Sequence, residues 1–126
     1  MGNENPLSNL IIGAAIEVHK QLGPGLLESA YEECLAHEFV LRNIPFERQK
    51  PLPVAYKDIQ LDCGYRLDFL VGGSVVVELK SVAKLAPIHQ AQMLTYLKLA
   101  NCKLGLLLNF NVRYMKNGIK RLALNL

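Results

Sequence analysis

The sequence predicts an α/β fold, in which a mixed β-sheet is flanked by helices on both faces. Apolar residues recur at spacings of three and four in three segments, alternate through the middle of the chain, and form one continuous later run. The order of these patterns is two helices, several strands, a helix and further strands. With 126 residues, 51% of them hydrophobic, residues 1–126 are expected to form a single domain with one core.

The N-terminal third is expected to contain two helices. Helical spacing of apolar residues predicts the first over residues 7–22, with Ser8 as its N-cap. Gly23-Pro24-Gly25 ends this helix, because glycine and proline interrupt helical geometry. The second helix is predicted from about Leu26 to Arg42.

After the second helix the apolar spacing becomes alternating, which predicts short β-strands. Pro51 and Pro53 favour an edge strand near residues 52–56, since proline cannot donate to a central ladder. Residues 57–58 are expected to form a turn, and residues 75–80 form a further strand.

The C-terminal third is expected to return to a helix and then to strands. Pro87 opens a helix that extends roughly from Ile88 to Ala100. The run LGLLLNF, residues 104–110, is typical of a strand that is covered on both faces. A last hairpin-like element turns at residues 116–118.

Composition and charge narrow the classes of function. The net charge of +3 permits an anionic partner without requiring one. No apolar run reaches the roughly 18 residues of a membrane span, and no secretory signal pattern precedes the first helix. Because Cys34, Cys63 and Cys102 lack metal-ligand spacing, we expect reduced, mostly buried thiols in a cytoplasmic protein without membrane contact.

The stretch LDFLVGGSVVVELK, residues 67–80, has the pattern of a β-hairpin but carries charged residues. With a two-residue turn, Asp68 and Glu78 point to opposite faces, and both faces mix charged with apolar side chains. With a three-residue loop over residues 72–74, Asp68 lies directly opposite Glu78 and the other face is wholly apolar, which favours this register. The apolar face then consists of Leu67, Phe69, Val71, Val75, Val77 and Leu79.

Two opposed carboxylates need a physical reason, because like charges directly across a strand pair destabilise it. A divalent cation provides one, since Mg²⁺ takes oxygen ligands and typically uses one or two carboxylates with water and substrate phosphate. Lys80 shares the face of Glu78 and can hold a phosphate or a nucleophilic water. The alternative is a solvated polar sheet face on which Lys80 or Arg66 neutralises a carboxylate.

Two helices carry further candidate residues. Glu28 lies three residues before Tyr31, which places it on or beside the inner face of its helix, although the helix dipole alone also favours a carboxylate in the first turn. In the third helix His89, Gln92 and Tyr96 share one face. Gln92 and Tyr96 offer neutral hydrogen-bonding groups that suit a lysine, a water or a phosphate.

The chain resembles one family from about Leu7 to Leu124. GLLESAY, residues 25–31, is the G-x-x-E-x-x-Y signature of the bacterial and archaeal GxxExxY family, and the similarity continues through IPFERQKPLPVAYKDIQLDCGYRLDFLV, VVVELKSV, HQAQMLTYLKL and LGLLLNFN. This family is placed in the PD-(D/E)XK phosphodiesterase superfamily. The resemblance implies a restriction-endonuclease-like core of a helix, three or four strands, a helix and a strand.

The resemblance also implies roles at the motif positions. Asp68 matches the first acidic residue, although Leu67 replaces the name-giving proline. The segment 78–80 matches the E-x-K element, and Glu28 matches a glutamate found in the first helix of many members. The Q-x-x-x-Y element of the exonuclease-like branch is matched by Gln92 and Tyr96.

The function expected from these matches is metal-dependent phosphodiester hydrolysis of nucleic acid, with DNA as the expected substrate. Asp68 and Glu78 hold Mg²⁺ or Mn²⁺, the Leu79 carbonyl offers a further ligand, and Glu28 completes or orients the coordination shell. Lys80 positions the attacking water or stabilises phosphoryl charge. The supporting or substrate-binding residues are Tyr31, His89, Gln92 and Tyr96.

Other functions stay open. The same fold suits a catalytically silent nucleic-acid-binding module, or a protein-interaction module in a repair or mobile-element system. Hydrolysis of small phosphodiesters is a further alternative. A homodimer or a larger repair complex is an expected assembly. Six basic residues are candidates for contacts with a phosphate backbone, with ordinary surface solubility as the alternative: Lys84, Lys98, Arg113, Lys116, Lys120 and Arg121.

Overall fold

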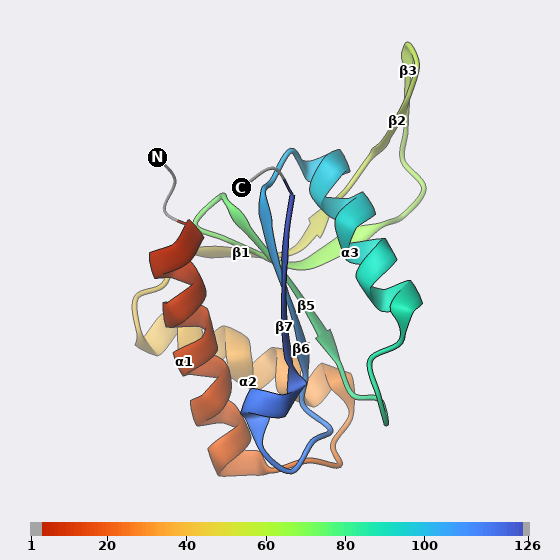
Figure 1. The fold of residues 1–126 in the computed structure, drawn as a ribbon. Coiled ribbons are helices and arrows are strands. Elements are labelled where there is room, and N and C mark those ends of the chain that lie inside the picture. The colour runs from red at the N-terminus through yellow and green to blue at the C-terminus, as the bar shows by residue number, and fades with distance from the viewer. Residues whose placement is uncertain (1–3, 125–126) are drawn as a thin grey trace.

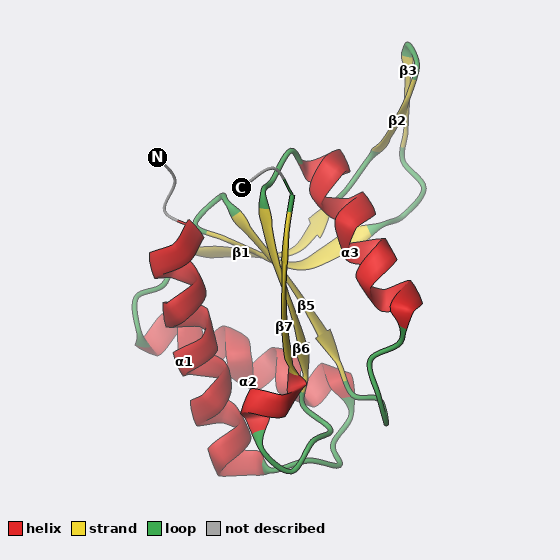
Figure 2. Ribbon diagram, viewed as in Figure 1, coloured by secondary structure: helices red, strands yellow, loops and turns green. Residues whose placement is uncertain are grey.

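The computed structural model describes residues 4–124, and its centre is a five-stranded mixed sheet (Figures 1 and 2). The strand order is β1-β4-β5-β6-β7. β5 and β6 pair in parallel, whereas the other three neighbouring pairs are antiparallel. The bounds are β1 Phe46–Pro51, β4 Arg66–Val71, β5 Val75–Lys80, β6 Leu104–Asn109 and β7 Ile119–Ala123.

Helices cover both faces of this sheet, which confirms the predicted α/β fold (Figure 1). α1 (Glu4–Leu22) and α2 (Glu28–Leu41) pack against one face, and α3 (Pro87–Ala100) packs against the other. α3 approaches β6 closely at Gly105, where a Cβ atom would collide with the Met93 side chain. A glycine at this position therefore allows the helix to dock on the sheet.

The helix ends differ in part from the sequence prediction. α1 begins at Glu4 rather than at residue 7, and Pro6 lies in its first turn, where proline is tolerated. The prediction of Ser8 as the N-cap is therefore wrong, because Ser8 lies inside the helix and is buried. α3 ends as expected near Asn101, which adopts the left-handed conformation common at helix C-termini (φ 55°).

The cysteines and the C-terminal turn give mixed outcomes. All three cysteines are free, but Cys34 and Cys63 are exposed and only Cys102 is buried, so the prediction of mostly buried thiols is wrong. α2 turns Cys34 outward while it buries Tyr31, Leu35 and Phe39. The turn expected at residues 116–118 falls within a short 3₁₀ helix, η1 (Met115–Gly118), which leads into β7. Within residues 4–124, no helix has the length and apolar character needed to cross a membrane.

Residues 52–65 form an arm that projects from the main sheet (Figure 1). Its strands β2 (Val54–Tyr56) and β3 (Ile59–Leu61) pair only with each other. The predicted turn at residues 57–58 is confirmed, and Lys57 has the positive φ (53°) of a tight turn. The edge strand predicted near residues 52–56 is thus a strand of this separate hairpin, because the edges of the main sheet are β1 and β7.

The β4–β5 hairpin has the predicted three-residue loop. Val71 pairs with Val75 and Phe69 with Val77, on either side of residues 72–74. One detail of the prediction is wrong: Leu67 packs in the core cluster on the α3 face, whereas Phe69 packs on the opposite face. The β4–β5 pairing stops after Phe69, so the strand is free to change its twist there and turn Leu67 away.

Candidate active site

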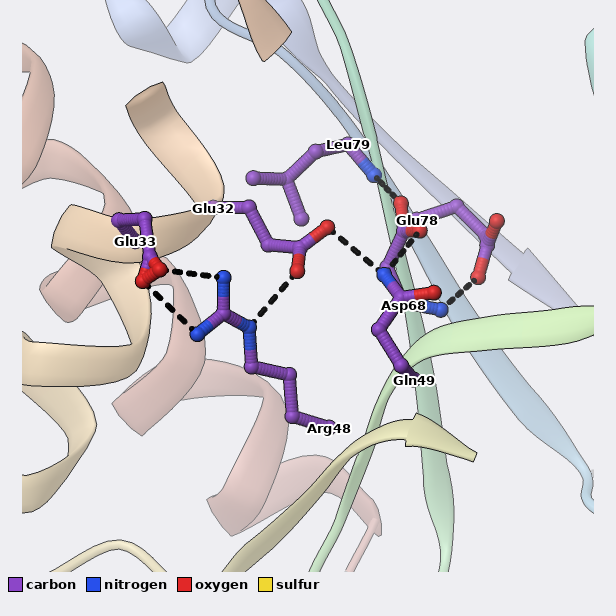
Figure 3. Close-up of polar contacts among 7 residues, drawn as sticks. All are labelled: Glu32, Glu33, Arg48, Gln49, Asp68, Glu78 and Leu79. Atoms are coloured by element: carbon purple, nitrogen blue, oxygen red, sulfur yellow. Dashed lines mark hydrogen bonds and ion pairs between the residues drawn. The ribbon is translucent and has the colours of Figure 1, made fainter. Parts of the chain in front are cut away.

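The β4–β5 ladder opens at the end far from its loop, and two carboxylates occupy the gap. The backbone N–H of Asp68 donates to Oε2 of Glu78 at 2.7 Å, and the N–H of Leu79 donates to Oδ2 of Asp68 at 2.8 Å (Figure 3). Each carboxylate thus replaces a backbone acceptor of the opposite strand. This exchange holds the two side chains close together at fixed positions.

Both carboxyl groups ionise less readily than usual. Burial, followed by the negative charge of Asp68, raises the pKa of Glu78 to about 8, and the Glu78 residue is only 6% exposed. Burial also raises the pKa of Asp68, while the hydrogen bond from the Leu79 N–H acts in the opposite direction. Two desolvated acids beside each other repel when both are charged, unless a nearby cation offsets the repulsion.

Glu28 and Lys80 lie within electrostatic range of this pair. Partial desolvation and then the negative charge of Asp68 raise the pKa of Glu28, whereas the charge of Lys80 lowers it. The charge of Lys80 also lowers the pKa values of Asp68 and Glu78. The structure therefore brings together Glu28, Asp68, Glu78 and Lys80, at the first residue of α2 and at the open end of the β4–β5 hairpin.

The loop before α2 explains how Glu28 reaches this position. The hydroxyl of Ser81, next to Lys80 in sequence, donates to the backbone oxygen of Leu26 at 2.7 Å. The Tyr31 hydroxyl donates to the Gly23 oxygen at 2.6 Å and accepts from the Leu26 N–H at 3.1 Å. The loop is thus fastened both to the end of β5 and to α2 itself.

Tyr31 supports the site through that loop rather than by facing the carboxylates. Its ring is fully buried and stacks on Phe110, with 4.6 Å between the ring centroids. Its hydroxyl is occupied by backbone groups of the loop. A fully buried ring offers no surface to a substrate, so the role of Tyr31 is to position the start of α2.

The three candidates on α3 have different surroundings. Tyr96 is nearly buried, and burial followed by the negative charge of Glu78 raises its pKa, so it lies near the carboxylates. Gln92 is exposed one turn earlier on the same helix. His89 uses its Nδ1 atom to accept from the Ala86 N–H at 3.0 Å, which closes the first turn of α3. That bond is a local capping role for His89.

Sequence reasoning missed a polar network that connects α2 and β1 to Asp68. Arg48 binds Glu32 and Glu33, with its Nε atom 2.7 Å from Oε2 of Glu32. Gln49 donates from Nε2 to Glu32 at 2.8 Å and, more weakly, to Oδ1 of Asp68 at 3.4 Å (Figure 3). The missed signal for Glu32 is its spacing, because it lies four residues after Glu28 on the same helix face.

The donor set suits a hard divalent cation. Asp68 and Glu78 each use one oxygen for a backbone N–H, and the other oxygen has at most a weak contact. Mg²⁺ and Mn²⁺ favour such carboxylate oxygens, and a cation would stabilise the charged forms that burial disfavours in both groups. Within residues 4–124, however, no three His, Cys, Asp or Glu side chains are grouped as a complete ligand set. Water or substrate must supply the remaining ligands.

The comparisons with known proteins agree with this geometry. A family model described as "PD-(D/E)XK nuclease superfamily" matches residues 5–122, and the chain belongs to this superfamily. Neither the search of curated proteins nor the search of solved structures found a match. Membership implies a nuclease that interacts with nucleic acid, and nucleases of this superfamily generally use divalent metal ions such as Mg²⁺.

Proposed function

We propose that this protein is a metal-dependent nuclease that hydrolyses phosphodiester bonds in DNA. The observation that carries the proposal is the pair of desolvated carboxylates at the open end of the β4–β5 hairpin, where Glu78 is buried and Asp68 is partly buried, with Lys80 beside them. A purely structural pair has little reason to retain two desolvated acids, since burying like charges costs stability. A site that binds a cation and a phosphate accounts for both acids and for the lysine.

Asp68 and Glu78 are the proposed ligands of Mg²⁺ or Mn²⁺, with the Leu79 carbonyl as a further ligand. When bound, the metal polarises the scissile phosphate and lowers the pKa of a bound water. Glu28 orients the coordination shell from the start of α2. Lys80 carries its ammonium next to these acids, where it positions the attacking water or stabilises charge on the phosphoryl oxygens.

The supporting roles follow from the surroundings of each residue. Tyr96 and Gln92 present a hydroxyl and an amide from α3 to Lys80 or to the DNA. Tyr31 holds the loop that positions Glu28, and His89 holds the first turn of α3. These four residues are therefore proposed as positioning or substrate-binding groups and not as metal ligands.

Several finer assignments accompany the proposal. The chain is assigned to the GxxExxY family on its motif, as a single domain over residues 1–126, with a cytoplasmic location and with assembly as a homodimer or in a repair complex. Backbone contacts are best supported near Arg113 and Lys116, which line a pocket of ≈ 570 Å³ together with Lys20. Positive side chains around one hollow suit a phosphate backbone.

The direct test is cleavage of end-labelled DNA with Mg²⁺, with Mn²⁺ and with a chelator. We expect Asp68→Asn and Lys80→Met to reduce cleavage by about 10²–10³-fold, because each removes a group that stabilises charge in the transition state. Asp58→Asn, on the tip of the projecting arm, is the matched acidic control and should cleave like the unaltered protein. Equal cleavage by all variants, or cleavage in chelator, would rule the proposal out.

A catalytically silent binding module is the second candidate. It is favoured by the incomplete ligand set, since no three acidic, histidine or cysteine side chains within residues 4–124 form a ready metal site. A silent module would bind DNA with the same affinity in the unaltered protein and in Lys80→Met, and neither would cleave it in either metal.

A further inference from the structure

A groove lies between α3 and the base of the projecting arm. Its volume is ≈ 480 Å³. The residues that line it include Val54, Tyr65, Ile88, Gln92, Thr95 and Tyr96. It is therefore built from the first strand of the arm, from the segment that returns into β4, and from one face of α3.

The walls of this groove are aromatic and apolar, yet open to solvent. Tyr65 is 46% exposed and Ile88 is 70% exposed. The rings of Tyr65 and Tyr96 lie 6.2 Å apart between centroids and are tilted by 62°, so neither ring covers the face of the other as a stacked pair would. Exposed large apolar side chains gathered in one hollow mark a binding surface.

Tyr96 connects the groove to the candidate active site. It lines the groove and packs in one buried cluster with Leu67 and Val76, which lie close to Asp68 and Glu78 along β4 and β5. Gln92 and Thr95 add an amide and a hydroxyl at its rim, and neither side chain forms a hydrogen bond with another residue between 4 and 124. The groove thus combines an aromatic wall with free polar groups next to the proposed phosphate site.

We propose that this groove binds an unpaired base of the substrate, stacked on Tyr65, so that the protein prefers single-stranded or frayed DNA to intact duplex. The proposal rests on the nuclease function above. A base on the strand that is held at Asp68 and Glu78 is covalently joined to the bound phosphate. Such a base is therefore the ligand most readily placed in the neighbouring groove. Only an unpaired base can present its face to a ring, since duplex bases are stacked on one another.

Gln92 and Thr95 suit the edge of such a base, because an amide and a hydroxyl each donate and accept hydrogen bonds. An apolar peptide would leave both groups without partners. The mixture of aromatic face and polar rim therefore favours a nucleobase over a protein segment.

The test measures binding separately from cleavage, in the Lys80→Met background with Mg²⁺ present, which keeps both proposed metal ligands. A labelled single strand and the duplex of the same sequence are compared by fluorescence anisotropy, and a 2-aminopurine in the single strand reports stacking by loss of fluorescence. We expect tighter binding of the single strand, and Tyr65→Ala should weaken it by roughly 10-fold or more while duplex binding barely changes. Tyr65→Phe keeps the ring and should restore both the affinity and the quenching.

Tyr56→Ala is the matched control, because Tyr56 is another exposed tyrosine on the arm (59%, against 46% for Tyr65) but does not line the groove. Equal affinity for both DNA forms, no binding of either, unquenched 2-aminopurine, or the same loss from Tyr56→Ala would overturn the groove proposal. Thermal melting of each variant identifies loss of fold. Cleavage by the unaltered protein is scored separately: Tyr65-dependent stacking without any cleavage would reject the nuclease function and keep the base site.

Discussion

The two ends of the β4–β5 hairpin have opposite physical character. At the loop end the backbone ladder is complete, Val71 and Val75 are fully buried, and Phe69 packs edge-on against Phe39 at 5.2 Å between centroids. At the open end the ladder stops, and the side chains of Asp68 and Glu78 take the place of backbone acceptors.

This contrast separates the part of the hairpin that stabilises the fold from the part that carries the proposed site. The loop end buries apolar surface, which is the main favourable contribution to folding. The open end buries acids whose charged forms are disfavoured, as the raised pKa values of Asp68 and Glu78 show. Asp68 and Phe69 are adjacent in sequence but belong to the two different ends. Substitutions at these two positions should therefore have different effects on the free energy of unfolding.

The largest expected effect is the difference in the free energy of unfolding between Phe69→Ala and Asp68→Asn. Phe69→Ala should lower the free energy of unfolding by about 3–5 kcal/mol, because it empties the centre of an aromatic cluster. Asp68→Asn should not lower it at pH 8, since an amide oxygen still accepts from the Leu79 N–H while the repulsion with Glu78 disappears. Urea unfolding followed by circular dichroism measures both values. A destabilised Asp68→Asn would mean that the open end also stabilises the fold.

The second effect is the pH dependence of stability, which is expected to come from Glu78 at the open end of the hairpin. The pKa of Glu78 is about 8 in the folded protein against 4.5 for the free group, so between these values the folded state holds a proton that the unfolded state has lost. The free energy of unfolding of the metal-free protein should therefore fall as pH rises from about 4.5 to 8, by on the order of 5 kcal/mol. Glu78→Gln should remove most of this fall.

The Glu78→Gln variant also distinguishes between two roles for Glu78, as a metal ligand or as a buried acid that binds no ion. Mg²⁺ added at pH 8 should raise the melting temperature of the unaltered protein, because an ion that binds only the folded state stabilises it. Glu78→Gln should show a much smaller rise. If Mg²⁺ changes the melting temperature of neither protein, Glu78 is not a metal ligand.

Much of the fold was predictable because it depends on apolar spacing. The loop over residues 72–74 followed from the requirement that one face of the hairpin be apolar, and its register is as expected. The position of Leu67 was not predictable, since it depends on where the ladder stops and not on alternation. The separate arm also escaped prediction, because Pro51 and Pro53 indicate an edge without telling which sheet the strand joins.

For the candidate site, the sequence supplied the acids and the lysine but not the residues that position them. The hairpin register predicted that Asp68 and Lys80 lie close together. For Glu28, which comes from a segment far away in sequence, helical spacing left two readings open and the family motif favoured the site. Gln49 gave no signal at all, since its role depends on a left-handed backbone conformation (φ 53°) that residue type does not predict.

A smaller effect is expected at the loop end, from alanine at the two glycines. Gly72 and Gly73 both have positive φ, at 58° and 69°, but only a Cβ on Gly72 would meet a neighbour, Leu7 at 2.7 Å. Gly72→Ala should therefore cost about 2 kcal/mol and Gly73→Ala about 1 kcal/mol. Neither should change cleavage per folded molecule, as measured at a temperature where both variants are folded. Reduced cleavage would show that the two ends of the hairpin are coupled.

The smallest expected effect on stability is that of replacing Gln49, which has a positive φ and contacts Asp68 at the open end of the hairpin. Glycine at a φ of 53° relieves the conformational cost, so Gln49→Gly should change the free energy of unfolding by less than about 1 kcal/mol. Lys57→Gly is the matched control, because Lys57 has the same φ of 53° in the turn of the projecting arm. The two variants should therefore melt alike and differ only in cleavage.

The expected difference in cleavage follows from the contact between Gln49 and Asp68. The Gln49 amide lowers the pKa of Asp68, so its loss should raise that pKa and move the acid limb of the pH–rate profile to higher pH. Lys57→Gly should leave the profile in place. A Gln49→Gly profile with an unmoved acid limb would contradict this, and would mean that the strained residue serves only to bind Glu32 and to hold α2 against β1.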